Sequence, residues 1–239
     1  MVERELAPSR EKAQALIMAG QVKVDDLPAN KAGSRIPIDA EIAVAGKDHP
    51  YVGRGGVKLE GALRHFGLDP TGLTALDIGA STGGFTDCLL QHGAERVIAV
   101  DVGYGQLAWE IRQNPRVTVL ERTNIRHLSP DALDTRVELA VVDVSFIALE
   151  TVLRDAVRFL TESGRILALL KPQFEAGKEQ VGRGGRVRDP AVHQEVLEKV
   201  TRAGEALGLK LVGATPSGLA GKKSGNLEIF VLWQQNRKI

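Results

Sequence analysis

Four charged residues, two lysines and two carboxylates, lie where they could transfer a proton. Asp143 follows the apolar part of VVDVSF, Lys171 follows that of ILALLKPQF, and Glu228 lies in NLEIF. Lys58 lies upstream in an amphipathic segment. A neighbouring carboxylate favours a charged lysine, whereas a second lysine or partial burial favours the neutral form that accepts protons. Together they predict acid–base chemistry, although each alone could be an ordinary ion pair or surface charge.

A glycine-rich turn, LDIGASTGGF, joins a predicted strand to the helix-like segment TDCLLQHG. Glycines let the backbone approach a ligand, and the first N–H groups of a helix are free to bind it. The spacing is not G-x-G-x-x-G, which counts against a nicotinamide dinucleotide. Asp101 ends the next predicted strand, 22 positions after Gly79, where a carboxylate can bind both ribose hydroxyls of an adenosine. We therefore predict an adenosine-containing cofactor, in particular S-adenosylmethionine.

Three further positions extend the predicted cofactor site. Asp77 would place a carboxylate near the loop, where it suits a cationic or amino-acid ligand. Asn124, after the third strand, could contact the adenine edge or simply cap a loop. Cys88 lies in the following helix and is expected to be core packing rather than a nucleophile. The loop residues expected to contact the cofactor are Gly79, Ala80, Ser81, Thr82, Gly83, Gly84 and Phe85.

These residues need a sheet to bring them together. Apolar segments alternate with helix-like segments near 83–92, 106–113 and 148–160, and a longer helix is predicted over 190–207. This alternation predicts an α/β fold with a parallel sheet covered on both faces. The last two segments, KLVGATPS and NLEIFVLW, have no helix between them and should pair antiparallel. We predict a Rossmann-like methyltransferase sheet of seven strands, the last one antiparallel, with Asp143 and Lys171 projecting beside the cofactor.

The first fifty residues have a different pattern. Ser9 is a plausible N-cap for a helix in SREKAQALIMAG, followed by short strands in QVKVDD and AEIAVAG around a turn at LPANKAG. The Gly, Pro and charge content of KDHPYVGRGG predicts a linker. We predict a small α+β domain over residues 1–46, a linker over 47–54 and the main domain over 55–239.

Composition limits the class of protein. The 239 residues include a single cysteine and carry a net charge of +1. An internal disulfide is thereby excluded, and any nucleic-acid contact must come from local basic patches. We find no signal peptide and no apolar run long enough to span a membrane. We expect a cytoplasmic protein with no membrane partner.

Long segments of the chain resemble a known family. The segments GRGGVKLEGAL, LDIGASTGGFTDCLL, DVGYGQL, DVSFIAL, LKPQFE and VGRGGRVRDP resemble the haemolysin A (TlyA-type) family of ribosomal RNA 2′-O-methyltransferases. The order Lys, Asp, Lys, Glu resembles FtsJ-type ribose 2′-O-methyltransferases, and SREKAQALIMAGQVKV resembles the family's N-terminal S-four-type RNA-binding domain. That domain departs from the family in a shortened start, MVEREL, and in VDD, where Val-Asn-Gly is common.

The resemblance implies S-adenosylmethionine-dependent methylation of a ribose 2′-hydroxyl, on cytidine, in ribosomal RNA. Lys58, Asp143, Lys171 and Glu228 match the catalytic tetrad, the loop Gly79–Gly83 matches the cofactor loop, and Asp101 matches the ribose-binding acid. Lys171 would take the hydroxyl proton during an in-line displacement, and Asp143 would orient Lys171. Lys58 would favour neutral Lys171 and stabilise the developing alkoxide, while Glu228 would hold Lys58 or the substrate ribose.

An RNA substrate brings phosphates, so its binding requires local basic segments. The glycine-rich segment Val181–Arg188 suits an arm over the substrate, and AGKKSGN is a second basic turn before Glu228. The candidate RNA-binding residues are Arg4, Arg10, Lys12, Arg183, Arg186 and Arg188. We expect a monomer that acts on ribosomal RNA or ribosomal subunits, and no metal.

Three other readings remain. A base N-methyltransferase commonly carries an Asn/Asp-Pro-Pro-aromatic motif where this chain has DVSF. A membrane-acting cytolysin would need an amphipathic or spanning apolar segment. A non-catalytic RNA-binding protein on a methyltransferase fold would be expected to have lost at least one residue of the tetrad.

Overall fold

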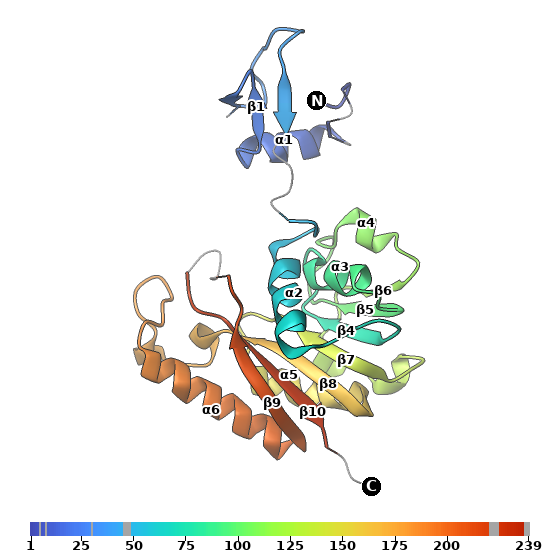
Figure 1. Cartoon of the computed structure of the whole chain (residues 1–239), viewed down its shortest axis with the longest axis vertical. Coiled ribbons are helices and arrows are strands. Elements are labelled where there is room, and N and C mark those ends of the chain that lie inside the picture. Colours follow the sequence, from blue (N-terminus) through green and yellow to red (C-terminus); the bar gives the residue numbers. More distant parts are fainter. Residues whose placement is uncertain (5, 8, 30, 45–48, 220–224, 237–239) are drawn as a thin grey trace. The chain divides into compact units, whose positions relative to one another are not determined.

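The computed structural model describes residues 1–4, 6–7, 9–29, 31–44, 49–219 and 225–236. The chain divides into two compact units, Met1–Pro50 and Tyr51–Ile239, drawn in Figure 1. Each unit is described by itself.

The first unit combines one helix with a small antiparallel sheet. Helix α1 (Arg10–Met18) begins after Ser9, whose hydroxyl accepts a hydrogen bond from the Lys12 backbone N–H, as predicted for the N-cap. The sheet has the order β2-β1-β3, and its strands are β1 (Val22–Val24), β2 (Leu27–Pro28) and β3 (Ile42–Val44).

Strand β2 lies where the sequence predicted only a turn. A two-residue connection, Asp25 and Asp26, joins β1 to β2, and both residues have positive φ (47° and 64°). Asn-Gly or Asp-Gly is the preferred pair in such turns, so Asp-Asp is only a weak signal for a turn at this position. The Asp25 carboxylate accepts a hydrogen bond from the Glu41 N–H at 2.8 Å, which ties the turn to the chain before β3.

The second unit is built on a seven-stranded sheet with the order β6-β5-β4-β7-β8-β10-β9. Five neighbouring strands are parallel, and β10 pairs antiparallel with both β8 and β9. The predicted sheet with an antiparallel last strand is therefore confirmed. The strands are β4 (Thr74–Ile78), β5 (Arg96–Val100), β6 (Val117–Leu120), β7 (Val137–Val142), β8 (Leu160–Leu170), β9 (Leu209–Pro216) and β10 (Ile229–Gln235).

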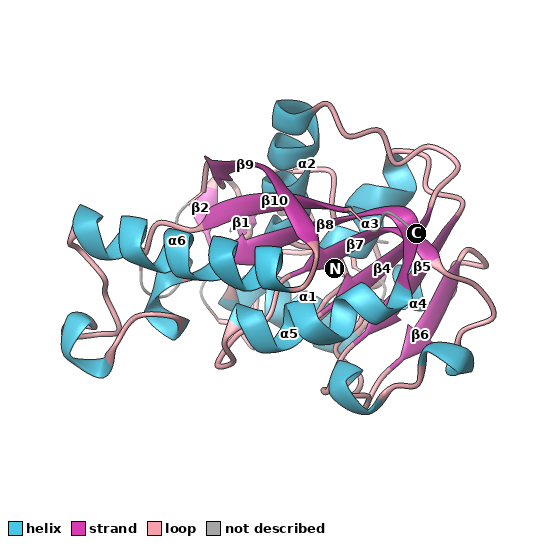
Figure 2. Ribbon diagram, turned by 90° about the horizontal axis from the view of Figure 1, so that it is seen from below, coloured by secondary structure: helices cyan, strands magenta, loops and turns pink. Residues whose placement is uncertain are grey.

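Helices cover both faces of this sheet (Figure 2). The α-helices are α2 (Arg54–Phe66), α3 (Gly84–Gln91), α4 (Trp109–Arg112), α5 (Leu149–Ala156) and α6 (Pro190–Ala206). Short 3₁₀ turns are η1 (Ile125–His127), η2 (Pro130–Ala132), η3 (Val157–Phe159), η4 (Pro172–Phe174) and η5 (Lys178–Gln180).

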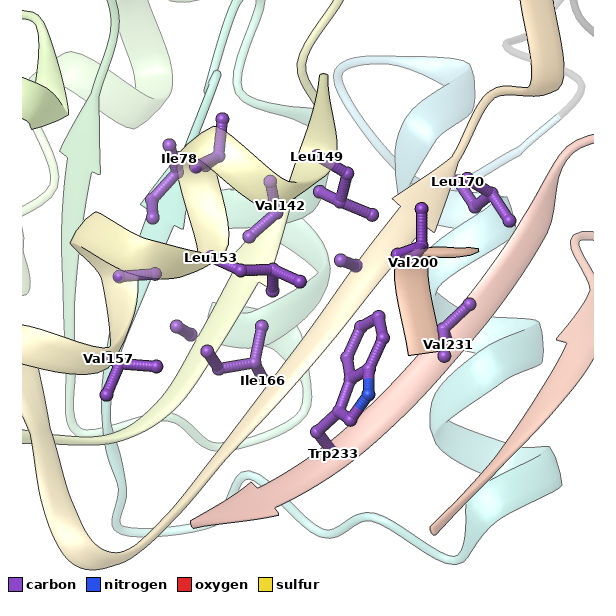
Figure 3. Close-up of a cluster of buried hydrophobic side chains, with 14 of the residues drawn as sticks. Ile78, Val142, Leu149, Leu153, Val157, Ile166, Leu170, Val200, Val231 and Trp233 are labelled. Carbon is purple, nitrogen blue, oxygen red and sulfur yellow. The ribbon is translucent and has the colours of Figure 1, made fainter. Parts of the chain in front are cut away.

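The core has two layers because successive residues of a strand point to opposite faces. Val231 and Trp233 of β10 pack in the cluster that includes Leu153 of α5 and Val200 of α6 (Figure 3). On the other face, Phe230 packs in the cluster with residues of α2 and α3. Cys88 belongs to this second cluster and is fully buried, as expected for core packing. Burial on both faces explains the nearly continuous apolar strands in the sequence.

The last four residues of the predicted linker fold with the second unit. Tyr51 is only 2% exposed and packs in the cluster that contains Leu59, and Arg54 is the first residue of α2. Gly56 makes room for Tyr51, because a Cβ there would lie 2.3 Å from the ring. The Tyr51 ring therefore packs on α2, although Tyr51 lies in the predicted linker.

None of the helices in the described part of the chain has the length and apolar character that crossing a membrane requires.

Candidate active site

The predicted lysine–carboxylate pair forms where two neighbouring strands end. Asp143 directly follows β7, and Lys171 directly follows the adjacent parallel strand β8. Lys171 Nζ lies 2.6 Å from Asp143 Oδ1 and donates a hydrogen bond to Ser145 Oγ at 3.0 Å. The lysine side chain is only 12% exposed. Its contacts with Asp143 and Ser145 hold the amine in one place at the edge where the parallel strands end.

The other two predicted residues form a second ion pair. Lys58 of α2 contacts the carboxylate of Glu228, and both side chains are largely buried. Glu228 lies just before β10 rather than within it, which corrects the sequence prediction. Because Ile229 pairs with Leu170, the residues that flank this pair, Glu228 and Lys171, lie beside each other. The four residues therefore gather at one edge as two adjoining ion pairs.

A pocket of about 110 Å³, open to solvent, adjoins Asp143. Its lining residues are Gly55, Gly79, Ala80, Ser81, Thr82, Gly84, Phe85 and Asp143. Helix α3 begins at Gly84 after an N-cap at Gly83, so its free N–H groups lie at the pocket wall. Two helix starts, those of α2 and α3, are in close contact here, because a Cβ on Gly84 would lie 3.1 Å from the Gly53 carbonyl oxygen. The predicted loop therefore lines a pocket beside the predicted catalytic pair.

Asp101, the residue predicted to bind ribose hydroxyls, is held beside the glycine-rich loop. It follows β5, and its carboxylate accepts hydrogen bonds from the N–H groups of Ser81 (2.7 Å) and Gly103 (2.6 Å). These bonds fix the carboxylate at the mouth of the loop, and each oxygen retains a second lone pair for a ligand hydroxyl. This donor and acceptor set fits an adenosine-type cofactor.

Asn124 has the more ordinary of its two predicted roles in this structure. Its side-chain oxygen accepts a hydrogen bond from the Arg126 N–H at 3.1 Å and caps η1. Contact with an adenine ring remains a prediction for its amide group.

Asp77 lies in β4, two residues before Gly79, and its contact with a cofactor remains a prediction. It is fully buried, and its Oδ2 accepts a hydrogen bond from the Thr86 hydroxyl at 2.6 Å. Among the residues that the structure describes, its Oδ1 has no hydrogen-bond partner. Burial raises the pKa of Asp77 to about 7, opposed by the Thr86 bond and assisted by the nearby negative charge of Asp143.

Ser145 and Phe146 were missed by sequence reasoning. Ser145 accepts a hydrogen bond from Lys171, and Phe146 is 89% exposed with a positive φ of 65°. The Phe146 ring packs against Phe174, with 4.9 Å between ring centroids. The sequence did carry a signal, because both residues lie within three positions of Asp143 in the DVSF segment.

The predicted RNA-binding residues belong to two separate parts of the chain. Arg183, Arg186 and Arg188 are exposed on a loop that Asn226 holds through the Val187 N–H and the Gly185 carbonyl. The second basic turn falls mainly on residues 220–224, outside those described.

In the first unit, Arg10 and Lys12 are exposed at the start of α1. Arg4 donates hydrogen bonds to the backbone carbonyls of Ala40 and Ile38, so it also holds this unit together.

Substituting Gly79 by alanine is expected to remove cofactor binding. Gly79 has a φ of +88°, and an added Cβ would lie 2.5 Å from the Asp143 carbonyl oxygen. The loop would have to move away from Asp143, so we expect at least a tenfold weaker affinity for S-adenosylhomocysteine by calorimetry and a loss of about 1–3 kcal/mol in stability. Gly61→Ala is the control, because that exposed helical position has open space around it. Equal affinity of Gly79→Ala and the unmodified chain would contradict this role of the loop.

Comparisons with known proteins agree with the two-part architecture. The FtsJ-like methyltransferase family matches residues 51–236, and the S4 domain matches residues 1–42. The 16S/23S rRNA (cytidine-2′-O)-methyltransferase TlyA of Mycobacterium tuberculosis is 49% identical over 234 residues, covering 98% of this chain and 87% of that protein.

Two solved structures extend the comparison. A protein from Streptococcus thermophilus, provisionally named a hemolysin, superposes with a TM-score of 0.80 at 40% identity, covering 96% of this chain and 84% of its own. An S-adenosylmethionine-dependent methyltransferase from Listeria monocytogenes shares the fold, with a TM-score of 0.57 at 14% identity over 77% of this chain and 100% of its own.

Proposed function

Because this chain belongs to the FtsJ-like methyltransferase family and carries an S4 domain, we propose that it methylates a ribose 2′-hydroxyl of ribosomal RNA. S-adenosylmethionine is the methyl donor, and cytidine is the target nucleoside, as in the mycobacterial relative. The observation that carries the proposal is the Lys171–Asp143 pair adjoining the pocket that Gly79 and Asp143 line together.

Binding of the cofactor supplies an electrophilic methyl group, and this chain's residues prepare the hydroxyl that attacks it. The 2′-hydroxyl is a weak nucleophile, so it must be held in line and lose its proton as it attacks. Lys171 Nζ accepts that proton when it is neutral, and Asp143 and Ser145 fix the direction of the amine. Lys58, held by Glu228, places positive charge near the developing alkoxide.

The surface beside this pair suits a nucleoside. Phe146 presents an exposed ring one residue after Ser145, and an exposed aromatic face can stack against a base of any sequence. Arg183, Arg186 and Arg188 supply exposed positive charge that can contact phosphates.

We further propose that residues 1–46 act as the RNA-binding domain and that a ribosomal subunit, rather than a short oligonucleotide, is the substrate. A structured RNA offers the shape and 2′-hydroxyl groups that such domains bind. The proposal includes a monomeric enzyme that works in the cytoplasm, where ribosomal RNA is made and assembled.

The test is methyl transfer from tritiated S-adenosylmethionine to ribosomal subunits from an unmodified strain. We expect label in RNA that survives alkaline hydrolysis as a 2′-O-methyl dinucleotide, because the methyl group blocks cleavage at that linkage. Label recovered on a base would instead indicate a base methyltransferase. Cofactor binding without label in either subunit would contradict ribosomal RNA as the substrate.

A further inference from the structure

Two loops carry the residues proposed for proton transfer, and they are fastened to each other. The first, residues 143–149, follows β7 and contains Asp143 and Ser145. The second, residues 171–175, follows β8 and begins with Lys171. Lys171 joins the loops at one end through its bonds to Asp143 and Ser145. The opposite ends are joined by a residue that the mechanism above does not use.

That residue is Glu175, a buried carboxylate that is 8% exposed. Its Oε1 accepts a hydrogen bond from the backbone N–H of Leu149 at 2.6 Å. Leu149 is the first residue of α5, and the N-cap position before it is Ala148, whose side chain has no acceptor. Glu175 therefore supplies from another loop the capping interaction that α5 lacks.

A third element supports Glu175 from behind. Lys199 of α6 donates a hydrogen bond to the Glu175 backbone carbonyl at 3.2 Å, and its Nζ lies 3.9 Å from Oε2. Burial raises the pKa of Glu175, while the Leu149 N–H and the Lys199 charge favour the ionised form. Burying a carboxylate destabilises the folded state unless hydrogen bonds or an opposite charge compensate for the lost hydration. An apolar side chain would therefore stabilise this position more if its role were packing alone.

We propose that Glu175 is a positioning residue for methyl transfer, acting through the start of α5 on the loop that carries Asp143 and Ser145. With Leu149 held by Glu175, residues 143–149 are fixed at both ends against residues 171–175. The Lys171 amine then keeps the two oxygen partners that direct it toward the hydroxyl. The expected effect of Glu175 on rate rests on the proposed function, whereas its contact with Leu149 between the two loops does not.

The kinetic test compares Glu175→Ala with Glu175→Gln. Glutamine keeps an oxygen acceptor for the Leu149 N–H, whereas alanine removes it. We expect alanine to lower kcat for methyl transfer to ribosomal RNA by about 10- to 100-fold, with KM and the cofactor Kd changed less than about twofold. Glutamine should restore kcat to within about threefold of the unmodified enzyme. Val97→Ala, a buried change in β5, which β4 separates from β7, controls for loss of thermal stability alone.

A second readout does not depend on activity. Hydrogen exchange of the peptide that covers residues 143–150 should be several-fold faster in Glu175→Ala but unchanged in Glu175→Gln and Val97→Ala. Unchanged exchange in Glu175→Ala, or an equal loss of kcat in Val97→Ala at the same melting temperature, would overturn the proposal. If the unmodified enzyme transfers no methyl group, the proposed function fails, while the exchange experiment still decides whether Glu175 fastens the loop.

Discussion

Replacing Lys171 by methionine is expected to lower the rate of methyl transfer by about a thousandfold and to leave cofactor affinity within about twofold. Methionine keeps the length and apolar stem of the side chain but has no amine to accept the hydroxyl proton. The amine is held by Asp143 and Ser145 at 2.6 and 3.0 Å, and Lys171 is not among the residues lining the cofactor pocket. The substitution should therefore affect the chemical step and spare binding.

The measurement is single-turnover transfer of tritiated methyl groups to ribosomal RNA, with calorimetry for S-adenosylhomocysteine. Lys210→Met is the matched control, because Lys210 is an exposed lysine on β9 and belongs to no proposed site. Asp143→Asn should weaken both rate and cofactor binding, because Asp143 also lines the pocket. A Lys171→Met enzyme with more than a tenth of the normal rate would remove Lys171 from the proton-transfer step.

Uninterrupted apolar runs in the sequence predict both the sheet and the grouping of the four charged residues. Strands buried on both faces leave uninterrupted apolar runs, and in a parallel sheet the ends of those runs meet at one edge. Asp143 and Lys171 each follow such a run directly, so their positions needed no tertiary information. Glu228 was harder to place, because its approach depends on the antiparallel register of Ile229 with Leu170.

The details that escaped prediction depend on contacts between distant residues. Tyr51 lies in the predicted linker, and only its packing against Gly56 of α2 places it in the second unit. Glu175 has no local sequence signal, because the helix that it caps begins 26 residues earlier. Asp77 stands at the expected position in the chain, but whether its carboxylate faces the ligand or the core is decided by Thr86 on the following helix.

The buried Asp77 carboxylate should make the second unit less stable at pH 8 than at pH 5. Burial raises its pKa to about 7, whereas an aspartate in the unfolded chain has a pKa of about 3.9. The folded state therefore binds the proton more tightly. The resulting stability is fully present below the unfolded pKa and is lost as the pH rises to about 7, with no further change above it.

Asp77→Asn removes this dependence, because asparagine keeps an oxygen for the Thr86 hydroxyl and never ionises. We expect the free energy of unfolding of the variant, relative to the unmodified chain, to rise by about 2–3 kcal/mol between pH 5 and pH 8. Urea unfolding followed by tryptophan fluorescence reports this unit, because both tryptophans, Trp109 and Trp233, belong to it. Asp69→Asn is the control, since hydrogen bonds from Thr71 lower the pKa of that exposed carboxyl and keep its titration below the range from pH 5 to pH 8.

A difference between Asp77→Asn and the unmodified chain that stays constant from pH 5 to pH 8 would mean that Asp77 does not titrate there. Its buried, unpartnered oxygen would then have to be stabilised by a group that the described residues do not supply.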